Sequence, residues 1–89
     1  MNSIYKVMIS ATIKNAIIAD DTLVVSLNDG RVISVPLTWY PRLIDATSSA
    51  RNNFRLIGRG TGLHWEEIDE DLSLNGILAG IPSRPQTVT

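Results

Sequence analysis

The sequence predicts an α+β fold: a three-stranded antiparallel meander followed by a helical segment, a short fourth strand, a glycine-rich loop and a C-terminal helix. Two adjacent segments, Thr22–Leu27 and Arg31–Val35, alternate apolar with polar residues, and Asn28-Asp29-Gly30 between them favours a β-turn. Near the end of the chain, apolar residues recur at the spacing of one helix face. A length of 89 residues suits one domain, which we expect to span residues 11–82 between an N-terminal arm (1–10) and a flexible tail (83–89).

The predicted meander begins with Ala11–Ala19, where β-branched residues alternate imperfectly until Asp20-Asp21 breaks the pattern. Pro36 is expected to end the sheet, because proline has no N–H to donate to a neighbouring strand. One face of the meander supplies the expected core, which consists of Leu23, Val25, Leu27, Ile33 and Val35.

The helical segment is predicted over Leu37–Ala46. Thr38 suits its N-cap, and Pro41 then lies in the first turn, where the missing N–H costs nothing. Further capping residues at Thr47-Ser48-Ser49 allow the helix to stop and restart over Ala50–Asn52.

The second half of the chain begins with Phe54–Ile57, which alternates apolar and polar residues as a fourth strand does. The glycine-rich segment Gly58–Gly62 then suits a loop, and Leu63–Ile68 suits a short strand. Ser73 can cap the last helix, and Gly80 with Pro82 can end it. The expected apolar stripe of that helix consists of Leu74, Ile77, Leu78 and Ile81.

Composition narrows the classes of function. A formal net charge of −1 gives no long-range attraction for nucleic acid or for a membrane surface, and no stretch approaches the ~20 apolar residues of a membrane span. The chain has no cysteine and no apolar N-terminal run suited to a signal peptide, so we expect a cytoplasmic protein. Arginines gather in the middle of the sequence and acids in Glu66–Asp71, which indicates either faces that pair with one another or a dipolar surface for a charged partner.

The chemistry-bearing residues concentrate in Gly58–Asp71, which holds the only histidine and five of the nine acidic residues. His64 and Glu66 would project to the same side of a strand, and with Asp69 or Asp71 they could form a weak metal site or a general acid–base pair. The alternative is a structural role, with His64 bonded to a nearby carboxylate or backbone group and Trp65 packed in the core. The spacing matches neither a calcium loop nor a phosphate-binding loop, so we assign no catalytic residue, no metal and no cofactor.

Two longer motifs carry a family resemblance: Val35-Pro36-Leu37-Thr38-Trp39-Tyr40-Pro41-Arg42-Leu43, and Gly60-Thr61-Gly62-Leu63-His64-Trp65 followed by Ile68-Asp69-Glu70-Asp71-Leu72-Ser73. On these residues the chain resembles the small bacterial family catalogued as domain of unknown function 2442, over roughly residues 7–80. The resemblance implies an α+β domain without an established activity. It also suggests a gene neighbourhood shared with another short protein in a toxin–antitoxin-like pairing.

The leading functional hypothesis is therefore a non-enzymatic, regulatory or antitoxin-like module that binds another small protein. The expected binding face consists of Arg42, His64, Trp65, Asp69, Glu70 and Asp71. The alternative is a small hydrolase or metal-dependent enzyme that uses His64 and the acidic cluster. Direct nucleic-acid binding through the arginines and Trp39 is disfavoured by the negative net charge, and a homo-oligomer stays open.

Overall fold

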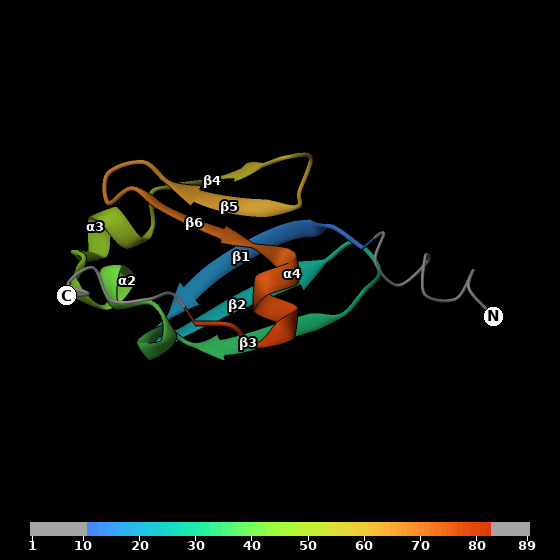
Figure 1. Cartoon of the computed structure of the whole chain (residues 1–89), viewed down its shortest axis with the longest axis horizontal. Coiled ribbons are helices and arrows are strands. Elements are labelled where there is room, and N and C mark those ends of the chain that lie inside the picture. The colour runs from blue at the N-terminus through green and yellow to red at the C-terminus, as the bar shows by residue number, and fades with distance from the viewer. Residues whose placement is uncertain (1–10, 83–89) are drawn as a thin grey trace.

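The computed structural model describes residues 11–82, so the predicted arm and tail lie outside the described residues. The chain forms two three-stranded antiparallel sheets in the order β1-β2-β3 (sheet A) and β4-β5-β6 (sheet B). Figure 1 shows the helix α4 lying across one face of sheet A, with sheet B beside it and the short helices α2 and α3 at one end. The α+β fold class is confirmed.

Sheet A is the predicted meander, built from β1 (Ile13–Ala19), β2 (Thr22–Leu27) and β3 (Val32–Pro36). Its inner face carries the predicted core: four of the five assigned residues are buried, and Ile33 is partly buried against them. Pro36 ends the sheet as expected: it is the last residue of β3 and pairs with Thr22. β3 is an edge strand, where a residue without an N–H is tolerated.

The helical segment differs from the prediction. It comprises the 3₁₀ turn η1 (Leu37–Trp39), α2 (Pro41–Asp45) and α3 (Ser48–Arg51). Thr38 is not an N-cap, because it lies inside η1. The helix α2 begins later, at Pro41, whose fixed φ suits the first position of a helix. The predicted restart is confirmed: Thr47 is the N-cap of α3, and its hydroxyl accepts a hydrogen bond of 3.1 Å from the Ala50 N–H.

Sheet B contains the predicted strand β4 (Phe54–Ile57) and two more strands, β5 (Gly62–Trp65) and β6 (Glu70–Ser73). The sequence indicated β5 but not β6. The predicted strand Leu63–Ile68 is too long, because the chain turns after Trp65 and Asp69 takes a positive φ of 52°. The returning segment pairs with β5, so the acidic run lies in a hairpin.

The glycine-rich loop becomes the β4–β5 turn, which holds the two sheets together. The Ile13 N–H donates to the Gly60 carbonyl at 2.7 Å, joining β1 to this turn. Gly60 has a φ of +87°, and a Cβ there would lie 2.9 Å from the Ile13 carbonyl oxygen. Only glycine fits without a shift of backbone.

The C-terminal helix α4 (Leu74–Ala79) begins, as predicted, with the Ser73 hydroxyl accepting from the Gly76 N–H at 2.9 Å. It ends, as predicted, at Gly80, which is its C-cap and adopts the left-handed conformation at φ 73°. Leu74 and Ile77 of the expected stripe are in the core, but Leu78, within the helix, is 43% exposed and Ile81, beyond its end, is 62% exposed.

Candidate functional site

A row of three side chains crosses the outer face of sheet B. The strand register places Arg55 of β4 beside His64 of β5, and His64 beside Asp71 of β6. Nδ1 of His64 hydrogen-bonds to Oδ1 of Asp71, as the structural alternative expected for this histidine. The imidazole is 18% exposed, whereas the Arg55 and Asp71 side chains are 65% and 67% exposed. The row is therefore open to solvent while its histidine is held in place.

Glu66 adds a second carboxylate on the other side of the imidazole. Its Oε1 lies 3.9 Å from Nε2 of His64 and 3.4 Å from Nη2 of Arg55. His64 and Glu66 are two residues apart, which brings them to one side of the chain as the sequence predicted. Exposed pairs of this kind contribute at most about 1 kcal/mol each, so they orient side chains more than they stabilise the fold.

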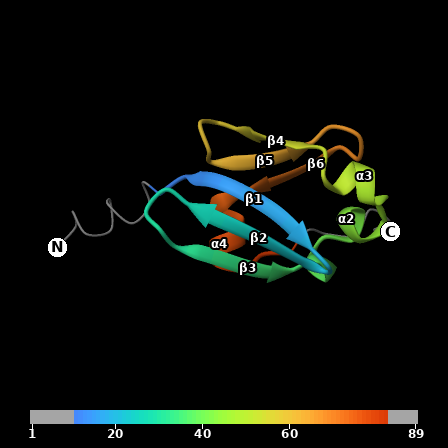
Figure 2. The ribbon, with the colours of Figure 1, turned by 180° about the vertical axis from the view of Figure 1, so that it is seen from behind.

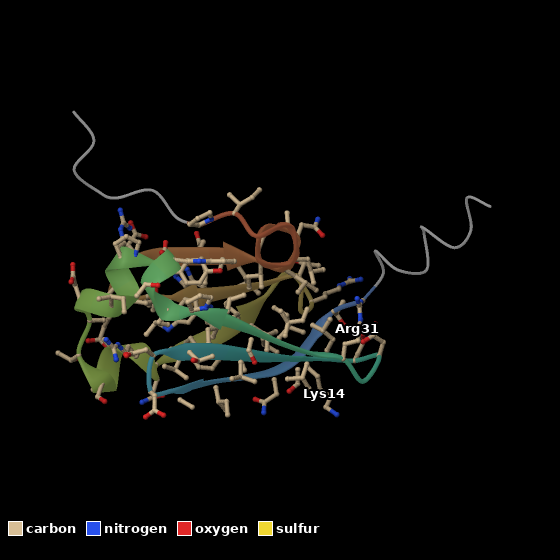
Figure 3. The ribbon with its side chains drawn as sticks, turned by 90° about the horizontal axis from the view of Figure 1, so that it is seen from below. Lys14 and Arg31 are labelled. Atoms are coloured by element: carbon tan, nitrogen blue, oxygen red, sulfur yellow. The ribbon has the colours of Figure 1, made fainter. Side chains whose placement is uncertain are left out.

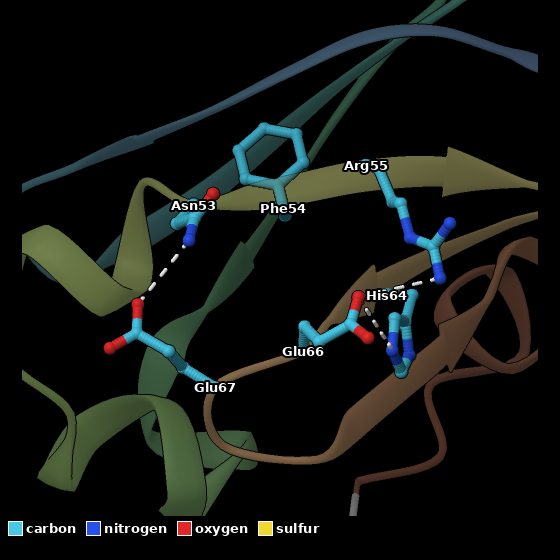
Figure 4. Close-up of a pocket in the computed structure, with 6 residues that line it drawn as sticks. All are labelled: Asn53, Phe54, Arg55, His64, Glu66 and Glu67. Carbon is cyan, nitrogen blue, oxygen red and sulfur yellow. Dashed lines mark hydrogen bonds and ion pairs between the residues drawn. The ribbon is translucent and has the colours of Figure 1, made fainter.

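These residues border a shallow hollow, shown in Figure 4. Its volume is about 320 Å³, and its lining consists of Asn53, Phe54, Arg55, His64, Glu66 and Glu67. On the side opposite His64, the Asn53 amide donates to the Glu67 carboxylate at 3.3 Å. The Phe54 ring packs against Trp65, with ring centroids 5.4 Å apart. The hollow thus offers hydrogen-bond donors, acceptors and an aromatic surface together.

Four of the six residues expected on one binding face lie on the strands of sheet B, and they separate onto its two sides. His64 and Asp71 lie on the outer face, but their sequence neighbours Trp65 and Glu70 point inward. Trp65 is fully buried, and its indole N–H donates to the Arg51 carbonyl at 2.8 Å. Glu70 is only 7% exposed, so the expectation of a single solvated acidic face is wrong at this residue. The strand alternation that places Asp71 outside necessarily turns Glu70 inside.

Glu70 affects a second buried group. Tyr40 is 1% exposed, and burial raises the pKa of its phenol, with the negative charge of Glu70 as a further cause. Among residues 11–82 the Tyr40 hydroxyl has no hydrogen-bond partner.

Arg42 and Asp69 meet, but not as an ion pair. The Arg42 guanidinium, on α2, donates to the backbone carbonyl of Asp69 at 2.5 Å and to that of Ile68 at 3.5 Å. This contact attaches the β5–β6 turn to the helical end of the domain and leaves the Asp69 side chain exposed. Arg42 therefore holds the backbone of the β5–β6 turn and does not contribute a charge to the row of Arg55, His64 and Asp71.

The sequence interpretation overlooked Asn53, Phe54, Arg55 and Glu67 as site residues. Arg55 stands between two apolar residues on β4, and this alternation already placed it on the face opposite the core. The sequence did not predict strand β6, which aligns Asp71 with His64.

The fold and the site can be compared with known proteins. A family model described as a protein of unknown function (DUF2442) matches residues 13–83. The chain belongs to this family. A crystal structure of a protein of unknown function from Rhodospirillum rubrum resembles this DUF2442 chain with a TM-score of 0.74 and 30% sequence identity, covering 83% of this chain and 92% of the other. No curated protein matches the chain.

Two further properties of the DUF2442 chain concern its chemistry. Residues 11–82 contain no group of three or more histidine or acidic side chains arranged to hold a metal ion. Across the same residues, no helix is long and apolar enough to cross a membrane.

Proposed function

We propose that this DUF2442 chain is a non-enzymatic module that binds another small protein through the outer face of sheet B. The observation that carries the proposal is the hollow beside His64, which charged groups of both signs line together with the partly buried Phe54. Protein interfaces commonly combine an aromatic contact with a polar rim. The three strands supply a rigid platform for these side chains.

The charge of this surface favours a basic partner. Four exposed carboxylates, on Glu66, Glu67, Asp69 and Asp71, outnumber the exposed guanidinium of Arg55. A lysine or arginine of the partner would meet these carboxylates, and the apolar part of its side chain could cover the Phe54 ring. Complementary charge of this kind raises the rate of encounter more than the final affinity.

The finer proposal is an antitoxin-like, regulatory role in the cytoplasm. It is supported by the acidic surface, which suits a short basic partner, and by a chain without cysteine, which suits a reducing compartment. The neighbouring gene offers a direct check. A short basic protein encoded there favours the pairing, whereas a metabolic operon favours catalysis.

The test begins with a pull-down from native cells, followed by association kinetics of the recovered partner with matched variants. Asp71→Asn removes one exposed charge from the site, and Asp45→Asn removes one from the exposed surface of α2. We expect Asp71→Asn and Glu66→Gln to slow association several-fold at low salt and to flatten its salt dependence. Asp45→Asn should leave both unchanged. Equal rates and equal salt slopes for all four proteins would remove sheet B from the binding face.

A second candidate, a hydrolase or metal-dependent enzyme, has one observation in its favour. Asp71 bonds Nδ1 of His64, an arrangement that can hold an imidazole for proton transfer at Nε2. Chromogenic ester and phosphoester substrates test it, with and without added zinc or manganese. Turnover that disappears in His64→Asn but persists in Asp45→Asn would replace the binding module with an enzyme.

A further inference from the structure

Within residues 11–82, nothing covers the outer face of sheet A, and the paired residues on this face carry no charge. Figure 2 shows this face from outside, and none of the elements of residues 11–82 crosses it. The register aligns its side chains in three rows across the strands. They are Asn15, Ile17, Ala19, Thr22, Val24, Ser26, Val32, Ser34 and Pro36. The other side of the same strands faces the core.

The face is apolar at its centre. Ile17 is 53% exposed and lies beside Val24 of the central strand, and Val32 is 61% exposed in the neighbouring row. The remaining positions are small or uncharged polar side chains. Large β-branched residues on an open sheet surface are what two packed sheets bury between them.

Charges of opposite sign flank the two ends of this face. The β1–β2 turn consists of Asp20 and Asp21, both exposed. At the other end, β1 has a bulge between Ile13 and Asn15, and Figure 3 shows the Lys14 side chain on the side of the sheet away from α4, with Arg31 at the same end. Arg31 is paired with Asp29 at 2.9 Å, whereas Lys14 has no ion-pair partner among residues 11–82. One end is therefore acidic and the other basic.

This arrangement is complementary to itself. A two-fold axis that lies in the plane of the contact and runs perpendicular to the strands would reverse the strand direction of the second copy. The acidic turn of each copy would then lie over the basic end of the other, twice by symmetry. The uncharged rows between the ends would meet without like charges in contact.

We infer that the outer face of sheet A is the contact between two copies of this chain, packed face to face with antiparallel strands. Lys14 of one copy lies over Asp20 and Asp21 of the other. The inference does not depend on the proposed binding surface of sheet B, which uses different residues. A dimer of this kind would present two sheet B surfaces and could hold two partner molecules.

The size of the face sets the strength expected. Three strands about 4.8 Å apart and about six residues long at about 3.3 Å per residue give a footprint of roughly 14 by 20 Å. This footprint, about 280 Å² per copy, is smaller than the roughly 800 Å² per partner of a standard interface, so the dimer should be weak and dissociate on dilution. Sedimentation velocity on the full chain, from about 1 μM to about 500 μM, covers the range of such weak contacts.

The first test places a charge at the centre of the face. Val24→Asp should raise the dissociation constant of the dimer at least tenfold, because the carboxylates of both copies would be buried near the two-fold axis. Val24→Thr keeps the shape without a charge and should dimerise nearly as the parent does. Circular dichroism must show that all three proteins are folded at the temperature of the sedimentation experiment, so that lost dimer is separated from lost fold.

The second test exchanges the flanking charges on exposed residues, where folding is not at risk. Lys14→Asp and Asp21→Lys should each weaken the dimer several-fold at low salt, and the double variant should restore the parent dissociation constant. A parent that is monomeric at every concentration overturns the inference. A double variant no better than either single variant overturns it as well. The inference is also overturned if the parent is monomeric and Val24→Asp loses binding to a different protein, because the face would then bind that protein and not a second copy.

Discussion

Val24 and Val25 are adjacent on β2 but point to opposite sides of sheet A. Aspartate at each position should therefore reduce stability by very different amounts. Val25 is fully buried between Ala16 and Ile33, whereas Val24 lies on the outer face beside Ile17. Val25→Asp forfeits about 1.5–3 kcal/mol of apolar burial and leaves an unpaired carboxylate in the core, at several kcal/mol more. A chain of 89 residues has only about 4–13 kcal/mol of stability in total.

We therefore expect Val25→Asp to be unfolded at 25 °C. Val24→Asp should fold and lose about 1 kcal/mol, the range of strand preferences at an exposed sheet position. Circular dichroism and urea denaturation at a concentration that keeps the protein monomeric provide the comparison. If the two variants melted cooperatively with equal midpoints, the assignment of core and outer faces in sheet A would be wrong.

Three further predictions concern other parts of the chain. Tyr40→Phe should leave stability at pH 7 unchanged or slightly higher, because it removes a buried hydroxyl without a partner among residues 11–82. Because the folded-state pKa of Tyr40 is raised, the parent should lose stability as the pH rises above the unfolded pKa of about 10, and Tyr40→Phe should lose less over that range in urea titrations. Gly60→Ala should cost more stability than Gly30→Ala: both glycines have positive φ, but only at Gly60 would a Cβ meet backbone of β1, and equal midpoints would contradict this contact. Zinc, manganese or calcium at several times the protein concentration should leave the melting temperature almost unchanged; a rise of several degrees that vanishes in His64→Ala would support the metal-dependent alternative.

Local signals in the sequence were sufficient for sheet A. Alternation over Thr22–Leu27 and the turn residues before Arg31 act between neighbouring segments, so no distant contact is needed to recognise the hairpin. The same holds for the Thr47 and Ser73 caps, whose side chains bond N–H groups three residues on.

Tertiary contacts determined the second sheet and hence the candidate site. Glu70–Ser73 is short and begins with two acidic residues, so its local pattern does not favour a strand. It becomes β6 by pairing with β5, and that pairing buries Glu70 while it brings Asp71 to His64. Similarly, Arg42 reaches the Asp69 carbonyl from 27 residues away. The sequence by itself determined which segments were strands or capped helices wherever the responsible interactions were local. The placement of each charged side chain inside or outside sheet B was decided by strand register, which only the tertiary structure fixes.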